Sequence, residues 1–156
     1  MRDGIQLRLL QAAEAFHDSL IRTDCSGTPL KRFPRECCNH ACNLLGVFLA
    51  EQGFSNINRI YGGRPVKTDG YGGHVWLEVE GFIVDITAYQ FDEVETPVIV
   101  TGESEWHNRL NGRSNRFDEY DDSLQECTKR IKADLNARCD NVYDRVAKTA
   151  LELLVE

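Results

Sequence analysis

Apolar residues recur at every third or fourth position in the first part of the chain, a pattern typical of an amphipathic helix. These positions include Ile5, Leu9 and Phe16, with charged and polar residues on the other faces. The pattern therefore predicts a helix over residues 4–22. Glycine and proline interrupt it over residues 23–35, which predicts a loop there.

A second apolar stripe predicts a helix that begins at Cys37 or Cys38 and ends at Gly53. The stripe consists of Ala41, Leu44, Leu45 and Phe48. A step of seven residues back from Leu45 places Cys38 on the core-facing side, at the N-terminal end of this helix. Cys37 is rotated from that side by about 100°, since an α-helix has 3.6 residues per turn.

Alternating apolar and polar residues later in the chain predict a β-hairpin. Residues 74–79 and 82–87 are the two strands, and the Glu-Gly pair between them suits a two-residue turn. With that turn, His74 and Asp85 become diagonal neighbours on one face, with Cβ atoms roughly 5–8 Å apart. A shift of the register by one residue would place the two side chains on opposite faces.

The other elements are shorter or less regular. We expect strands over residues 57–62 and 97–101, a glycine-rich loop over 64–73, a polar loop over 102–118 and helical structure over 119–155.

Composition and net charge limit the classes of binding partner that we expect. The 156 residues are 42% hydrophobic and 28% charged, which fits one globular domain over residues 1–156. A net charge of −7 without a run of Lys or Arg argues against nucleic acid or an anionic membrane as a partner. No segment approaches the ~18 apolar residues of a membrane span, and the N-terminus is too charged for a signal peptide. We expect a cytoplasmic protein, or an effector secreted without a signal peptide.

Six cysteines are more than a chain of this length usually contains. They are Cys25, Cys37, Cys38, Cys42, Cys127 and Cys139. Three of them and His40 provide four potential zinc ligands within six residues. Four ligands on one and a half helical turns cannot converge on one tetrahedral centre, so we expect no metal and no other cofactor. A zinc protein is the less favoured alternative, which metal analysis of the purified chain tests. Most of the cysteines are expected to be free, packed thiols.

Cys38, His74 and Asp85 occur in the order expected for a thiol-dependent amide enzyme. Unpaired N–H groups and the positive dipole end at a helix N-terminus favour a thiolate and can bind an oxyanion. A carboxylate that holds a histidine fixes its tautomer and stabilises the imidazolium. Apolar neighbours indicate that Asp85 is buried, and a buried carboxylate needs a partner. Cys38 is the first candidate for the nucleophile and Cys37 the second.

Structural roles are the alternative for each of these residues, because cysteines on apolar helices and histidines on strands commonly serve packing and hydrogen bonding. His107, which follows Trp106, is a spare candidate base without an acidic partner at an obvious spacing. We expect His107 to lie at the surface or at the rim of the site.

Three motifs together resemble a known group of enzymes. FPxxxCxxxxxLL from residue 33, GHxWLEV from residue 73 and IVDIT from residue 83 resemble the transglutaminase-like branch of the papain-like cysteine enzymes. This superfamily includes transglutaminases, arylamine N-acetyltransferases, cysteine peptidases and protein-glutamine deamidases. The resemblance covers residues 33–101. DITAYQF, which begins at Asp85, also resembles small bacterial proteins of this superfamily.

The resemblance implies an α+β, papain-like fold, with a nucleophile helix packed on a small antiparallel sheet and flanked by N- and C-terminal helices. It matches Cys38 to the nucleophile, His74 to the general base and Asp85 to the orienting carboxylate. The chain departs from the family at Asn39, where glycine or tryptophan often follows the nucleophile. The usual upstream glutamine is also missing, so backbone N–H groups would hold the oxyanion.

The expected function is hydrolysis of an amide in a protein or peptide substrate, as a cysteine peptidase or glutamine deamidase. Nothing in the sequence marks a site for an amine acceptor, so acyl transfer by the same triad is the alternative. A non-catalytic binding module with this fold is a further alternative. Trp76 either lines the acyl pocket or belongs to the core, and Gln90 is expected to support the site from the end of the Asp85 strand.

Overall fold

The computed structural model describes residues 2–66, 70–110, 113–116 and 124–155. Within them the chain forms helices and one antiparallel sheet, so the predicted α+β class is confirmed. None of the described helices is long and apolar enough to cross a membrane. The elements in chain order are α1 (Arg2–Arg22), α2 (Cys38–Glu51), β1 (Ile57–Val66), β2 (Gly70–Val79), β3 (Phe82–Asp85), η1 (Ala88–Gln90), β4 (Ile99–Thr101), α3 (Glu105–Asn108), β5 (Arg113–Arg116), α4 (Leu124–Arg138) and α5 (Val142–Leu154).

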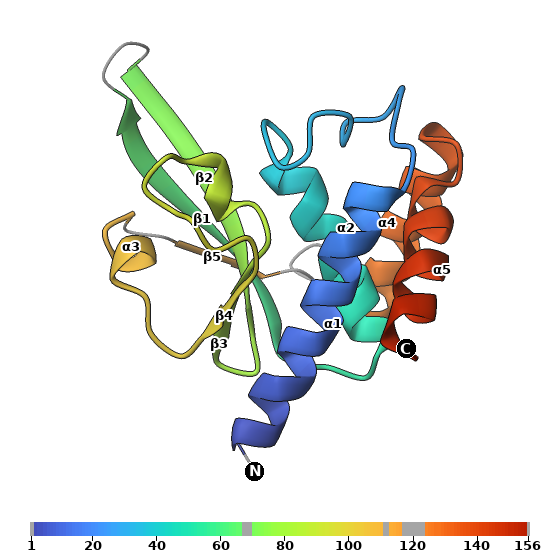
Figure 1. Ribbon diagram of the computed structural model, residues 1–156, viewed down its shortest axis with the longest axis horizontal. Helices are drawn as coiled ribbons and strands as arrows, with labels where there is room; N and C mark the ends of the chain where they lie inside the picture. The colour runs from blue at the N-terminus through green and yellow to red at the C-terminus, as the bar shows by residue number, and fades with distance from the viewer. Residues whose placement is uncertain (1, 67–69, 111–112, 117–123, 156) are drawn as a thin grey trace.

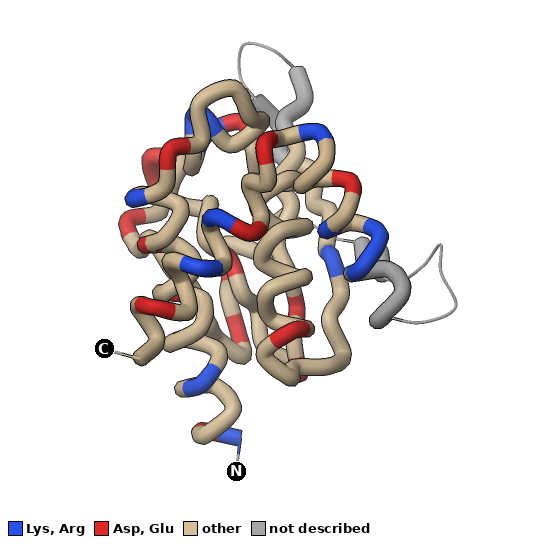
Figure 2. The backbone as a smooth tube through the Cα atoms, turned by 90° about the vertical axis from the view of Figure 1, so that its right-hand side faces the viewer, with Lys and Arg blue, Asp and Glu red and all other residues tan. Residues whose placement is uncertain are grey.

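The elements form a helical layer against one face of the sheet. The strand order is β4-β3-β2-β1-β5. Figure 1 shows α1, α2, α4 and α5 on the right of the sheet and the short helix α3 on its left. Helix α2 packs on β2, and α4 and α5 cover the outer sides of α2 and α1. Acidic and basic positions are interspersed along the backbone (Figure 2).

Alternation along β2 divides its side chains between two apolar clusters. Val75, Leu77 and Val79 face the helices and belong to the main core. Each fully buried aliphatic or aromatic side chain there contributes about 1.5–3 kcal/mol. Trp76 points the other way, into a smaller cluster with Ile60, Ile83 and Leu110. The β2–β3 hairpin is therefore covered on both faces, and a polar residue within it is shielded from water.

The predicted hairpin register is confirmed. Val79 pairs with Phe82 across the turn, and the pairing continues along the two strands. Glu80 and Gly81 both have positive φ, 54° and 84°, as a type I′ two-residue turn requires. Because the register is set by this turn, Asp85 ends β3 on the same face as His74.

Helix α2 begins and ends close to the predicted residues. Cys37 is its N-cap residue and makes no side-chain capping hydrogen bond. Glu36, just before it, has a φ of 60°, and this left-handed residue turns the chain into the helix. At the other end, Gly53 has a φ of 95°, which a glycine adopts without steric cost.

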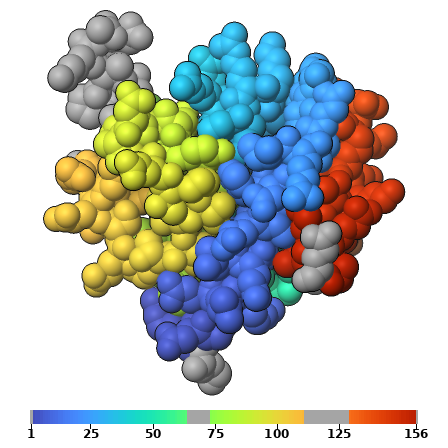
Figure 3. Space-filling view, viewed as in Figure 1, coloured from blue at the N-terminus to red at the C-terminus, as the bar shows by residue number. Residues whose placement is uncertain are grey.

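Helix α1 holds the segment that follows β3. Its Gln6 donates a hydrogen bond to the carbonyl oxygen of Val100 in β4. His17 Nε2 and the hydroxyl of Tyr89 in η1 lie 2.9 Å apart. In the space-filling view, the blue surface of α1 borders the yellow-green surface of this segment (Figure 3). The contacts fix the chain just beyond Asp85.

Two predicted loops were wrong in part. Residues 64–73 are mostly strand, because β1 and β2 continue to pair as far as Val66 and Gly70; residues 67–69 lie outside the described residues. Glycine suggested a loop there, whereas the backbone pairing extends through the glycines. The polar stretch 102–118 contains α3 and β5, which polarity alone concealed.

Candidate active site

The carboxylate of Asp85 is the centre of a buried hydrogen-bond network. Oδ1 accepts from the backbone N–H groups of Thr87 and Ala88, each at 2.9 Å. Oδ2 accepts from Nε2 of His74 and Nε2 of His107, each at 2.7 Å. Asp85 is only 1% exposed. Burial alone would raise the pKa of this carboxyl, but the charge of His74 and the hydrogen bonds from both histidines lower it below its usual range.

His74 is fully buried on β2, with one ring nitrogen used and one free. Burial opposes its protonation, yet the charge of Asp85, the hydrogen bond to it and the neighbouring Cys38 thiol raise the pKa of His74 to about 9. Nδ1 has no hydrogen-bond partner among the described residues. Since Nε2 is held by Asp85, Nδ1 is the ring nitrogen left for the neighbouring Cys38 thiol.

Cys38 is the accessible cysteine of its cluster. It is half-buried, whereas Cys37 and Cys42 are 1% and 4% exposed. The Cys42 thiol donates to the carbonyl oxygen of Val75 at 3.3 Å. Burial raises the pKa of Cys37 to about 12 and raises that of Cys42 well above its usual value. Cys38 is therefore the least enclosed of these three cysteines.

The N-terminus of α2 offers hydrogen-bond donors beside this thiol. The first N–H in the helix to find a backbone carbonyl is that of Ala41, which donates to Cys37. By helix geometry the N–H groups of Cys38, Asn39 and His40 have no partner within the helix. They and the positive end of the helix dipole favour negative charge at this position.

Gln90, at the end of η1, bonds to the chain just before α2. Its Oε1 accepts from the backbone N–H of Glu36 at 3.4 Å, and so joins η1 to the residue two positions before Cys38. This contact links the end of the Asp85 strand to the start of α2.

Aromatic rings surround the His74 imidazole. Trp76 stacks on it with ring centroids 5.8 Å apart, and Phe91 and Trp106 approach it at 5.3 and 5.5 Å. Trp76 is 3% exposed and packs against β1, where a Cβ on Gly62 would come within 2.9 Å of its ring. Of the two roles expected for Trp76, the structure favours the core. The half-buried Phe91 and Trp106 are the rings that solvent can reach.

His107 does not lie at the surface, contrary to the prediction. It is 2% exposed and bonds Asp85, 22 residues earlier in the chain, because α3 folds against the sheet. Ser104 is the N-cap of α3, and its hydroxyl accepts from the backbone N–H of His107. A capping serine three residues before a histidine was the sequence signal for a short helix in this polar stretch.

The same three side chains could be considered as metal ligands. Ligand atoms of His74, Asp85 and His107 lie within 4.8 Å of one another, and they are the one such group among the described residues. Ligand atoms around a tetrahedral metal with bonds near 2.0 Å are separated by roughly 3.3 Å. The observed 2.7 Å contacts instead match N–H···O hydrogen bonds. Among the described residues the cysteine cluster does not bring three such ligand atoms together, and the Cys42 thiol bonds to Val75.

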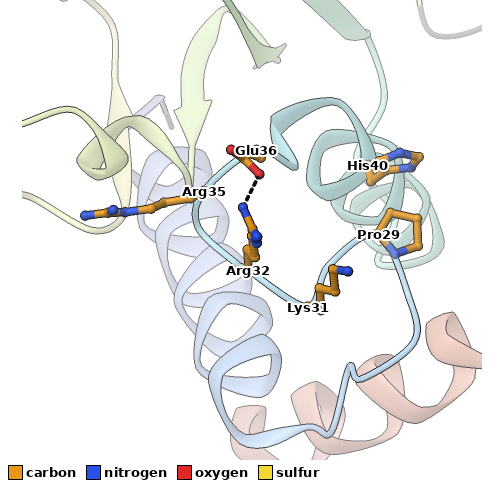
Figure 4. Close-up of a pocket in the computed structure, with 6 residues that line it drawn as sticks. All are labelled: Pro29, Lys31, Arg32, Arg35, Glu36 and His40. Carbon is orange, nitrogen blue, oxygen red and sulfur yellow. Dashed lines mark hydrogen bonds and ion pairs between the residues drawn. The ribbon is translucent and has the colours of Figure 1, made fainter.

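A pocket of about 370 Å³ opens beside the start of α2. Figure 4 shows Arg32 paired with Glu36 across it, Lys31 and Pro29 on its loop side and His40 on the helix. The Arg32–Glu36 ion pair is 2.9 Å long and exposed. The pocket gives the N-terminal end of α2 a locally basic wall in a chain whose net charge is −7.

Comparisons of the chain with protein families, with curated proteins and with solved structures find no match. Its class is therefore defined by fold and site alone. The chain is an α+β protein in which a half-buried cysteine at a helix N-terminus lies beside a buried His–Asp–His network.

The stability of the fold is expected to depend on pH through His74. The pKa of His74 is about 9 in the folded protein and 6.5 in the unfolded chain. The contribution of His74 to the free energy of unfolding is therefore fully present below pH 6.5. The contribution, about 3 kcal/mol, is lost as the pH rises through 9. Urea unfolding at pH 6 and pH 9.5 measures it, with His74→Gln as the control. An equal pH dependence in both proteins would contradict the assignment to His74.

Proposed function

We propose that this protein is a thiol-dependent amide hydrolase, a cysteine peptidase or protein-glutamine deamidase, that acts through Cys38, His74 and Asp85. The observation that carries the proposal is the arrangement around His74. One ring nitrogen is held by a buried carboxylate, and the other is left for an accessible thiol at a helix N-terminus. A purely structural histidine would be expected to use both nitrogens, because an unpaired buried polar atom is costly.

The first half of the reaction forms an acyl-enzyme. Because the pKa of His74 is about 9, Nδ1 carries at neutral pH the proton that the Cys38 thiol gives up, and the sulfur attacks the carbonyl carbon of the amide as a thiolate. The negative oxygen that develops is held by the free N–H groups at the start of α2. The C–N bond then breaks, the imidazolium gives its proton to the departing nitrogen, and ammonia or an amine leaves. Asp85 stabilises the imidazolium throughout.

Water completes the cycle. His74 takes a proton from a water molecule, whose oxygen attacks the thioester carbonyl. The C–S bond breaks, the carboxylic acid leaves, and Cys38 regains its proton. With an amine in place of water the same steps give acyl transfer, which is the second candidate. The half-buried rings of Phe91 and Trp106 beside His74 can limit which acceptor reaches it.

Burial and packing support Cys38 over Cys37 as the nucleophile. Cys37 is the N-cap residue, is enclosed, and has a thiol that burial keeps protonated. The α+β architecture, with a cysteine-bearing helix on an antiparallel sheet that carries the histidine and the carboxylate, supports assignment to the transglutaminase-like branch of the papain-like fold. That assignment remains part of the proposal.

Deamidation, acyl transfer and peptide cleavage are distinguished by their products. The protein is incubated with a glutamine-containing peptide or protein, with and without a primary amine, and ammonia and modified residues are measured. Deamidation releases ammonia and forms glutamate in either condition. Acyl transfer requires the amine and links it to the peptide. Cleavage of the chain without ammonia release identifies a peptidase. A set of substrates that yields none of these products favours the non-catalytic binding module.

Thiol reactivity tests the Cys38–His74 pair without a substrate. At pH 6, iodoacetamide is expected to label Cys38 at least ~10-fold faster in the wild type than in His74→Gln, because glutamine removes the imidazolium that stabilises the thiolate. Mass spectrometry of the labelled peptide gives the rate for each cysteine. Cys25, which is buried on another part of the chain, is the internal control. Equal rates at Cys38 in both proteins would leave only the binding-module alternative.

A further inference from the structure

We propose that His107 is a positioning residue of this site, which shares Oδ2 of Asp85 with His74 and so limits how strongly that carboxylate binds the protonated form of His74. The proposal deepens the proposed function and depends on it for any effect on activity. Its geometric basis is independent of the chemistry at Cys38.

The hydrogen bonds saturate the carboxylate. Each carboxylate oxygen accepts about two hydrogen bonds. Oδ1 has two backbone donors, at Thr87 and Ala88, and a longer bond of 3.4 Å from the Thr87 hydroxyl. Oδ2 has the two imidazole donors. With these donors around it, the Asp85 carboxylate cannot rotate or accept a water molecule without breaking one of these bonds.

The partner of the other ring nitrogen fixes the orientation of His107. Nδ1 lies 2.6 Å from the hydroxyl oxygen of Ser104, which already accepts the backbone N–H of His107. The hydroxyl proton is therefore free to point at Nδ1, and the ring then donates through Nε2 to Asp85. Trp76 and Trp106 pack edge-on against the ring, each with centroids 4.8 Å away. His107 thus reaches Asp85 as a preorganised donor.

The electrostatic consequence concerns His74. The ionisable groups around it are Asp85 on β3, His107 on α3 and Cys38 on α2, and Cys42 acts on Asp85 from the next turn of α2. Asp85 is the one acid among those described groups, and two imidazoles draw on its charge. A donor at Nε2 of His107 spreads the negative charge of Oδ2, so the imidazolium of His74 gains less from it than it would from an unshared carboxylate.

A titration of the histidine rings tests this sharing. The chain has four histidines, so ring-nitrogen NMR of the labelled protein can follow each one, with His74→Gln used for assignment. His107→Phe keeps an aromatic ring against Trp76 and removes the donor. Its expected effect is to raise the His74 titration midpoint by roughly one pH unit. His107→Gln, whose amide can donate to Asp85, is expected to restore a midpoint close to that of the wild type.

The outcomes separate a positioning role from simple packing. A midpoint in folded His107→Phe that is unchanged or lower would overturn the proposal, as would His107→Gln and His107→Phe behaving alike. If His107→Phe does not fold, two measurements replace it. The wild-type spectrum must show His107 protonated at Nε2, and Ser104→Ala must raise the His74 midpoint by a smaller amount. The His74 midpoint could rise in His107→Phe while Cys38 is alkylated at the same rate in the wild type and in His74→Gln. That result would refute the proposed function and support this inference.

Discussion

Replacement of Cys38 by alanine is expected to abolish amide hydrolysis and leave the fold intact. Loss of the nucleophile of a triad lowers turnover by about 10⁴-fold or more, because the residual rate comes only from binding and the oxyanion donors. Cys38 is half-buried at a helix end, so the free energy of unfolding should change by less than about 1 kcal/mol. Product release from a responsive glutamine peptide and urea unfolding measure the two effects.

Cys37→Ala is the matched control for this variant, since it removes a neighbouring thiol of the same size from the same helix start. It should retain activity and lose some stability, because Cys37 is enclosed in the core. Equal activity in the wild type and Cys38→Ala would refute the proposed nucleophile. Activity lost only in Cys37→Ala would move the assignment by one residue.

Asp85→Ala is expected to cost both stability and activity. The change leaves two buried imidazoles and two backbone N–H groups without their acceptor, and removal of one partner from a buried ion pair typically costs 3–5 kcal/mol. His74 also loses the group that orients it and raises its pKa. Urea unfolding at pH 6 and the rate of Cys38 alkylation measure the two losses.

Asp85→Asn removes the negative charge of Asp85 and keeps the size and shape of its side chain. The amide fills the same space and can still accept from Thr87 and Ala88 through its oxygen, but it cannot stabilise an imidazolium. It should therefore recover part of the stability lost in Asp85→Ala and none of the thiol reactivity. A destabilisation below about 1 kcal/mol in Asp85→Ala would show that the network contributes little to the fold.

Local patterns in the sequence were sufficient to predict the elements that carry Cys38, His74 and Asp85. The apolar stripe placed α2, and the Glu-Gly turn set the register that brings His74 and Asp85 together, because a two-residue turn leaves one pairing. The strands β1 and β2 were predicted too short. Their glycine-rich ends pair through the backbone, and backbone pairing leaves no trace in side-chain alternation.

The part of the site that could not be predicted depends on tertiary contacts. His107 lies in a polar stretch, and no local pattern indicates that α3 folds onto the sheet and buries it. The core position of Trp76 likewise follows from the absence of a side chain at Gly62, across the neighbouring strand. The sequence left two adjacent cysteines, Cys37 and Cys38, as candidates for the nucleophile. Their burial in the structure distinguishes them.

The network around Asp85 also has a consequence for the order of folding. His74 and Asp85 can meet as soon as the hairpin forms, since only a two-residue turn separates their strands. His107 reaches them only when α3 packs against the sheet. During refolding, the thiol of Cys38 should therefore reach its native reactivity at the same time as α3 docks on the sheet. Pulsed alkylation compared with hydrogen exchange at α3 can follow this, and native reactivity acquired before α3 is protected would contradict it.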